Sequence, residues 1–173
     1  MVFLAETSAS NVSSVAFNGY FTADYDVYKI FIDGWYGTTP SYSRLTFNTT
    51  GSYTEQTSNY FYHLGSYYEY GGNTTSISYD HNFGGANAIN WGVHGNVQAS
   101  SLVAEITLYN PLSTTYQKLI SVEQVSYYSS YLGFGSSVGG WQVGGTATTG
   151  ITLKANTGNI YARKIRLYGI KNS

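Results

Sequence analysis

Residues 102–109 read Leu-Val-Ala-Glu-Ile-Thr-Leu-Tyr, and every second position, beginning at Leu102, is aliphatic. The positions between them carry a mixed set of Val, Glu, Thr and Tyr. Successive side chains of a β-strand point to opposite faces, whereas a helix repeats every 3.6 residues. The segment is therefore predicted to be a strand with one face buried, formed by Leu102, Ala104, Ile106 and Leu108.

The same alternation extends outward through the chain. It is clear in residues 25–33, 151–154 and 164–168, and no stretch of eleven residues shows a convincing helical period. Further strands are expected near 41–48, 58–69, 75–81, 87–93, 116–126 and 138–143, separated by turn signals such as Asn18-Gly19, Asp33-Gly34 and Gly158-Asn159. Many short strands without intervening helices indicate an antiparallel sandwich, and eight or more strands suit a jelly roll.

The predicted fold is thus an all-β, antiparallel, jelly-roll-like β-sandwich in a single domain, residues 12–173. Residues 1–11 are expected to form an N-terminal arm that becomes ordered on a neighbouring subunit. The Gly/Ser/Tyr-rich stretch 126–140 is interpreted as a strand end followed by a long flexible loop.

Charged residues make up only 10% of the 173 residues, and the net charge is −1. Nucleic-acid binding needs clustered Lys and Arg, so we expect no nucleic-acid partner. No apolar run approaches the ~18 residues of a membrane span, so no membrane partner is expected either. A surface with so little charge favours association with other proteins.

Acidic and basic residues are unevenly distributed, with an excess of acids in residues 1–110 and of bases in residues 111–173. We favour the explanation that distant strands pair, so that Asp26 and Asp33 face Arg163, Lys164 or Arg166 across a ladder. The alternative is charge complementarity across a subunit interface.

The sequence contains no phosphate-binding loop, no nucleophile elbow and no cysteine. His63, His81 and His94 lack metal-ligand spacing, and each is interpreted as a residue beside a turn. The carboxylates Asp24, Asp26, Glu55, Glu69 and Asp80 show no spacing that supports the acid pair of a glycosidase. We therefore expect no enzyme activity, no cofactor and no metal.

The most unusual feature is the 19 tyrosines, many of which fall in the clusters 60–70 and 127–134. Adjacent tyrosines on a strand point to opposite faces, so only half of each cluster can fill the core. The others face a protein partner, a sugar ligand or solvent. We predict that Tyr67, Tyr68, Tyr127, Tyr128 and Tyr131 face a partner.

Four segments resemble virion structural proteins of tailed bacteriophages, particularly marine and cyanobacterial ones. They are SSVAFNGYFTADYDVYKIFIDG (13–34), HGN (94–96), AEITLYNPLSTTYQKLI (104–120) and GITLKANTGNIYARKIRLYGIK (150–171). The resemblance runs from about residue 12 to 171 and implies a jelly-roll-like sandwich used on capsid exteriors, tails and fibres, often as a trimer. It brings no catalytic residue.

The resemblance implies a virion location. The absence of a coiled-coil or collagen-like shaft favours a capsid decoration (cement) protein, a homotrimer bound to the major capsid protein. The alternative is a tail-fibre tip module that recognises a host surface glycan through loops near Trp35-Tyr36 and 126–140.

Overall fold

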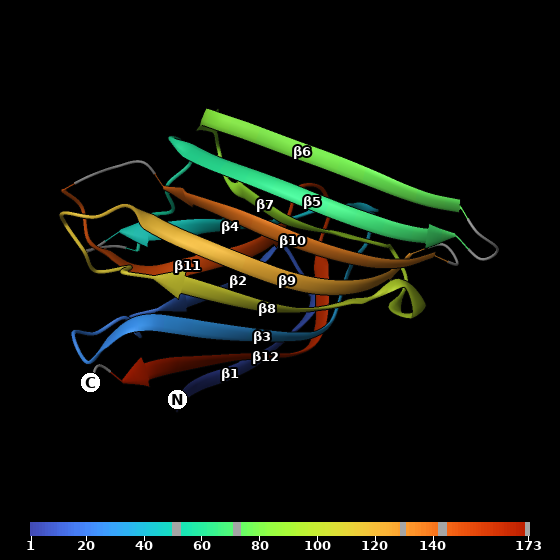
Figure 1. Cartoon of the computed structure of the whole chain (residues 1–173). Helices are drawn as coiled ribbons and strands as arrows, with labels where there is room; N and C mark the ends of the chain where they lie inside the picture. Colours follow the sequence, from blue (N-terminus) through green and yellow to red (C-terminus); the bar gives the residue numbers. More distant parts are fainter. Residues whose placement is uncertain (50–52, 71–73, 129–130, 142–144, 172–173) are drawn as a thin grey trace.

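The computed structural model describes residues 1–49, 53–70, 74–128, 131–141 and 145–171. Within these residues the chain forms two antiparallel sheets and one short 3-10 turn, Gln98–Ser100. Sheet A contains, in spatial order, β1 (Val2–Val12), β12 (Ile160–Lys171), β3 (Tyr25–Gly37), β8 (Leu102–Tyr109), β9 (Lys118–Tyr128), β10 (Tyr131–Trp141), β5 (Tyr60–Tyr70) and β6 (Thr74–Ala86). Sheet B contains β2 (Ser14–Asn18), β11 (Thr148–Ala155), β4 (Ser41–Thr49) and β7 (Ile89–His94). Figure 1 shows the strands of sheet A following one another from β6 at the top to β1 at the bottom.

The strand order has the form of a jelly roll with two inserted hairpins. A jelly roll is a long antiparallel hairpin of four strand pairs that is rolled into two sheets. Here the four pairs are β1–β12, β2–β11, β3–β8 and β4–β7, and they alternate between sheets A and B. The predicted all-β sandwich is confirmed.

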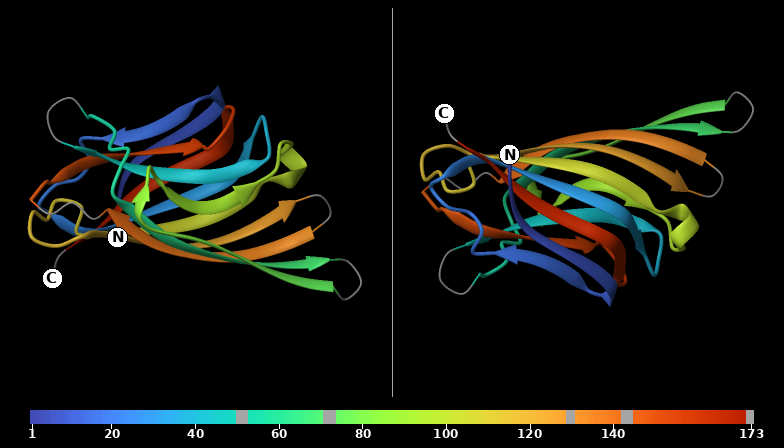
Figure 2. Two further views of the ribbon diagram at one scale, coloured as in Figure 1. Left: turned by 90° about the horizontal axis from the view of Figure 1, so that it is seen from above. Right: turned by 90° about the horizontal axis from the view of Figure 1, so that it is seen from below.

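The inserted hairpins are β5–β6, between β4 and β7, and β9–β10, between β8 and β11. β10 pairs with β5, so the two hairpins join into one four-stranded extension of sheet A beyond β8. Figure 2 shows the β5–β6 hairpin projecting beyond the rest of the molecule. Sheet A is therefore wider than sheet B.

The N-terminal segment 1–11, expected to be an arm outside the sandwich, instead forms most of β1 and pairs with β12 of the same chain. Ala9 is buried in the core, and Glu6 lies opposite Arg166, whose Nε donates a hydrogen bond of 2.8 Å to it. The Ser, Thr and Asn content of this segment hides its strand character. Its partner strand is also more than 150 residues away in the sequence.

Segment 126–140 was expected to be a strand end followed by a long flexible loop, with a further strand near 138–143. The loop prediction is wrong for residues 131–137, because β10 already begins at Tyr131. At Gly135, Gly139 and Gly140, neighbouring atoms occupy the space that a Cβ would need. A Cβ on Gly135 would come within 2.5 Å of Gln124 Nε2, and one on Gly140 within 2.4 Å of the Lys118 carbonyl oxygen. Glycine normally weakens a strand, but here it permits close packing.

The core lies between the two sheets and contains the predicted inner face of β8. Trp35 of β3 and Trp91 of β7 are fully buried and pack edge-to-face, with their ring centroids 5.5 Å apart. The fibre-tip alternative expected an exposed recognition loop near Trp35. The burial of Trp35 in β3 contradicts this expectation.

Asp33 of β3 contacts a basic residue of β12, as expected if the two strands pair. The Arg163 guanidinium donates to both Asp33 carboxylate oxygens, at 2.7 and 2.8 Å, and these bonds hold the pKa of Asp33 below its usual value. Both partners are solvent-accessible, so such a pair contributes at most about 1 kcal/mol.

Candidate binding face

The outer face of sheet A, the side turned away from sheet B, exposes many large apolar side chains. Strands β6, β8, β9 and β10 contribute nine of them, with exposed fractions between 37% and 65%. These are Tyr79, Val103, Tyr109, Leu119, Val125, Tyr127, Leu132, Phe134 and Val138. Each alternates with an inward-facing residue of its strand, so all nine share one face.

The outer face of sheet B has the opposite character. Asn48 of β4 donates a hydrogen bond of 3.0 Å to the hydroxyl of Thr152 on β11. Thr46 donates to Glu55 at 2.8 Å, and Glu55 is also ion-paired with Lys154. Polar side chains thus satisfy one another on sheet B, and the concentration of exposed apolar groups is specific to sheet A.

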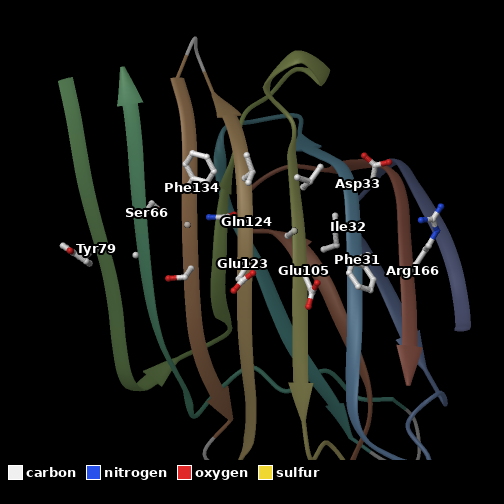
Figure 3. A pocket seen from close by; sticks show the side chains of 16 residues that line it. Phe31, Ile32, Asp33, Ser66, Tyr79, Glu105, Glu123, Gln124, Phe134 and Arg166 are labelled. Atoms are coloured by element: carbon white, nitrogen blue, oxygen red, sulfur yellow. The ribbon is translucent and has the colours of Figure 1, made fainter. Parts of the chain in front are cut away.

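A hollow of about 1010 Å³ lies on this outer face and extends over strands from β6 to β12 (Figure 3). One side of it is an apolar row, in which Phe134 of β10, Val125 of β9 and Val103 of β8 lie directly opposite one another. Leu132 and Tyr127, the next opposed pair on the same face, continue this apolar surface toward the end of the strands.

The next row across the hollow is polar. Ser136, Glu123, Glu105, Phe31 and Arg166 lie opposite one another on β10, β9, β8, β3 and β12. Figure 3 shows Glu105 and Glu123 side by side in the middle of the sheet. We refer to these two residues as the carboxylate pair.

The two members of the carboxylate pair differ in their partners. Glu105 forms an ion pair with Lys29 of β3. Within the described part of the chain, the Glu123 carboxylate receives neither a hydrogen bond nor an ion pair, and Glu123 is exposed. Directly opposed like charges are unfavourable in a sheet. The pair is therefore a site where a positive group from outside is favoured.

A second, smaller hollow of about 350 Å³ lies on the other side of the polar row. Its lining is mainly apolar and includes Phe61, Tyr109, Leu119 and Val138. The outer face thus consists of two apolar zones separated by a row with a net negative centre.

Of the tyrosines predicted to face a partner, Tyr127 is 48% exposed on the outer face. The side chains of Tyr67, Tyr68, Tyr128 and Tyr131 lie outside the described residues, so that part of the prediction stays a prediction. The backbone register nevertheless places Tyr67 opposite Phe134, in line with the apolar row.

The partner-facing residues predicted from the sequence were all tyrosines, whereas the face also contains exposed valines and leucines. Sequence reasoning also missed the carboxylate pair, whose members are 18 positions apart in the sequence and meet only through the β8–β9 register. A signal was present in residues 119–127, where apolar residues occupy both faces of the strand.

The three histidines occupy different environments. His94 is fully buried, its Nδ1 lies 3.0 Å from the Gly95 carbonyl oxygen, and burial lowers its pKa. His63 is exposed and packs on Tyr79 and His81, at ring distances of 5.8 and 6.5 Å. Among the described residues no three His, Asp or Glu side chains gather as a metal site would require.

Lys118 is an unusual buried group at the start of β9. It is completely buried, its Nζ has no hydrogen-bond partner among the described residues, and the Nζ lies 5.7 Å from the centre of a Trp141 ring. Burial lowers the pKa of Lys118. No hollow described above reaches this side chain, so Lys118 bears on stability rather than on binding.

The described residues contain no helix of the length and apolarity that crossing a bilayer demands.

No protein-family model and no curated protein sequence matches this chain. Among solved structures, it is similar to the laminarinase catalytic domain from Thermotoga maritima MSB8, with 13% identity, 96% of this chain and 77% of that chain covered, and a TM-score of 0.27. It is also similar to a C2 domain of plant Extended Synaptotagmin 1, with 7% identity, 88% and 99% coverage and a TM-score of 0.17. A third is the Crh5 transglycosylase, with 8% identity, 98% and 89% coverage and a TM-score of 0.15. These similarities are too low to support any functional argument.

Proposed function

We propose that this chain is a non-enzymatic structural protein of a bacteriophage virion, and specifically a capsid decoration protein that binds the major capsid protein. The observation that supports this proposal most strongly is the exposed apolar outer face of sheet A. The resemblance of residues 12–171 to tailed-phage virion proteins supplies the biological context.

The size of the apolar face is the physical argument for a partner. Tyr79, Tyr109, Tyr127 and Phe134 are between 37% and 65% exposed. At about 150–250 Å² per ring, they leave about 300–500 Å² in contact with solvent. The aliphatic residues add to this area, whereas the largest patch on a typical monomer is about 300–600 Å².

Covering the four rings yields about 7–12 kcal/mol of gross hydrophobic free energy at about 25 cal/mol per Å². Association itself costs about 4–15 kcal/mol. Binding of one copy is therefore modest, and many copies assembled as homotrimers on a shell multiply it. Modest binding by each copy, multiplied over many copies, is consistent with a cement protein.

The test uses purified particles of the virus that encodes the chain. Quantitative mass spectrometry should find the chain at a copy number comparable to that of the major capsid protein. Particles assembled with Val125→Asp protein should lose the chain and become less heat-stable, whereas Val97→Asp, at a 50%-exposed position beside the 3-10 turn, should leave binding unchanged. The proposal is refuted if the chain is absent from particles, or if the Val125→Asp variant joins particles as well as the wild type does.

A second candidate function is a glycan-binding module at a fibre tip. It is favoured by the rings of Tyr79, Phe31 and Phe134, which line the same hollow as the carboxylate pair. Aromatic rings stack on sugars and carboxylates accept hydrogen bonds from sugar hydroxyls. An oligosaccharide array would give a bound glycan in this case, and particles would then contain the chain at a small fraction of the capsid copy number.

A further inference from the structure

We propose that the partner of the outer face is a polypeptide segment that places an Arg or Lys side chain against Glu123, with apolar side chains on both sides of it. This inference deepens the proposed function and rests on it. The carboxylate pair and the two apolar zones that flank it carry the argument.

The first step concerns the charge that a partner must neutralise. Glu105 and Glu123 are directly opposed in the β8–β9 ladder, where Cβ atoms are about 4.5–5.5 Å apart. Lys29 neutralises Glu105 only, and no described residue pairs with Glu123. A partner that covers both apolar zones also removes water from Glu123. Because an unpaired carboxylate is poorly tolerated without water, the partner must bring a cation.

The second step disfavours another copy of this chain, placed face to face, as the occupant. The cations on or beside the outer face are Lys29, Arg163, Lys164 and Arg166, and each is ion-paired within the described part of its own chain, with Lys164 and Arg166 sharing Glu6. With Glu123 included, these four cations meet four carboxylates, so a second outer face brings no net positive charge. A segment whose Arg or Lys is free of such ion pairs complements Glu123 better.

The third step concerns the chemical class of the partner. Five of the nine exposed apolar residues are the branched aliphatic Val103, Leu119, Val125, Leu132 and Val138. A sugar ring needs a flat aromatic surface, whereas branched side chains interdigitate with other side chains. The face therefore suits a polypeptide better than a glycan. Arg fits the site best, because its planar fork can bond two neighbouring carboxylates at once.

The experiment uses the intact purified chain as bait for a random 12-residue peptide library displayed on yeast. Enriched peptides should carry an Arg or Lys between apolar residues. The most enriched peptide is then synthesised and titrated by calorimetry against the wild type, Glu123→Gln and the control Asp24→Asn, which removes an exposed charge near the start of β3. We expect at least tenfold weaker binding to Glu123→Gln and unchanged binding to Asp24→Asn.

A charge exchange sharpens the test. Glu123→Arg should abolish binding of the cationic peptide, and a peptide with its cation changed to Glu should restore binding to that variant. Circular dichroism checks that each variant remains folded. Enriched peptides without a cation, or equal binding to wild type and Glu123→Gln, overturn the inference.

The outcomes separate this inference from the proposed function. If Val125→Asp protein fails to join particles while Glu123→Gln protein joins them normally, the face binds a virion protein but the cation does not direct it. Concentration-dependent dimers in sedimentation experiments that Val125→Asp abolishes would assign the face to a second copy. Binding of oligosaccharides to the same face would assign it to a glycan. Either result contradicts the inference.

Discussion

The substitution Tyr60→Phe isolates one buried hydrogen-bonding position at the end of sheet B. β7 pairs with β4 only as far as Ile89, which lies opposite Leu45, so the backbone of Phe47 on that side has no strand partner. Two groups replace the missing strand. The Phe47 N–H donates to the Tyr60 hydroxyl at 2.7 Å, and the Gln56 N–H donates to the Phe47 carbonyl at 2.9 Å.

Removing the Tyr60 hydroxyl leaves the Phe47 N–H buried without an acceptor, while the ring keeps its stacking on Phe47 and Trp141. An unsatisfied buried donor costs about 1–3 kcal/mol. For a domain of about 150–250 residues, each kcal/mol lowers Tm by about 2–4 °C. We therefore expect a Tm decrease of about 2–12 °C.

Urea denaturation followed by tryptophan fluorescence, together with calorimetry, measures both quantities. The matched control is Tyr116→Phe, which removes the same hydroxyl from a side chain that is 68% exposed and should change stability by less than about 0.5 kcal/mol. If Tyr60→Phe is as stable as Tyr116→Phe, the hydroxyl does not complete the β4 edge and the reasoning is refuted.

Three further predictions concern ionisable groups. Burial lowers the folded-state pKa of Lys118, so the unfolding free energy should rise as pH increases toward 10.5. Because Nζ has no hydrogen-bond partner among the described residues, Lys118→Met should remove this slope and stabilise the fold by about 1–3 kcal/mol in urea titrations. A loss of stability would contradict this reasoning. Burial also lowers the folded-state pKa of His94 below 6.5, so its contribution to stability is complete above pH 6.5 and is lost as pH falls through the folded-state value. Between pH 7.5 and pH 5.5, the unfolding free energy of the wild type should fall more than that of His94→Gln. An equal decrease in both proteins would contradict a role of His94 in this pH dependence. Finally, Glu123→Gln should stabilise the free protein by about 0.2–1 kcal/mol at low salt by relieving repulsion from Glu105, an effect that should fade in high salt.

The sequence was sufficient to predict structure where one strand carries its own pattern. The alternation in residues 102–109 predicted both the strand β8 and its buried face, and the opposite charges of Asp33 and Arg163 predicted the contact of β3 with β12. The first part of β10, residues 131–137, was missed because its glycines usually mark loops. At Gly135, Gly139 and Gly140, atoms of neighbouring strands occupy the Cβ positions, which no local pattern shows.

The candidate face was harder to predict, because it depends on the pairing of strands from two separate insertions. Val103, Val125 and Phe134 become one row only when β8, β9 and β10 are placed in register. The same holds for Glu105 and Glu123. Tyr127 is 48% exposed, which agrees with the argument that adjacent aromatic residues on a strand cannot all point into one core, and its contact with a partner stays a prediction.

The two hairpin insertions carry most of the exposed apolar face, although they lie outside the eight-stranded roll. The eight strands of the roll close around Trp35 and Trp91. Much of the exposed apolar face is carried by β6, β9 and β10, which lie outside those eight strands. Outward-facing residues of the added strands can therefore change during evolution with little cost to the roll. A lineage of such proteins can exchange one binding target for another while its central framework stays the same.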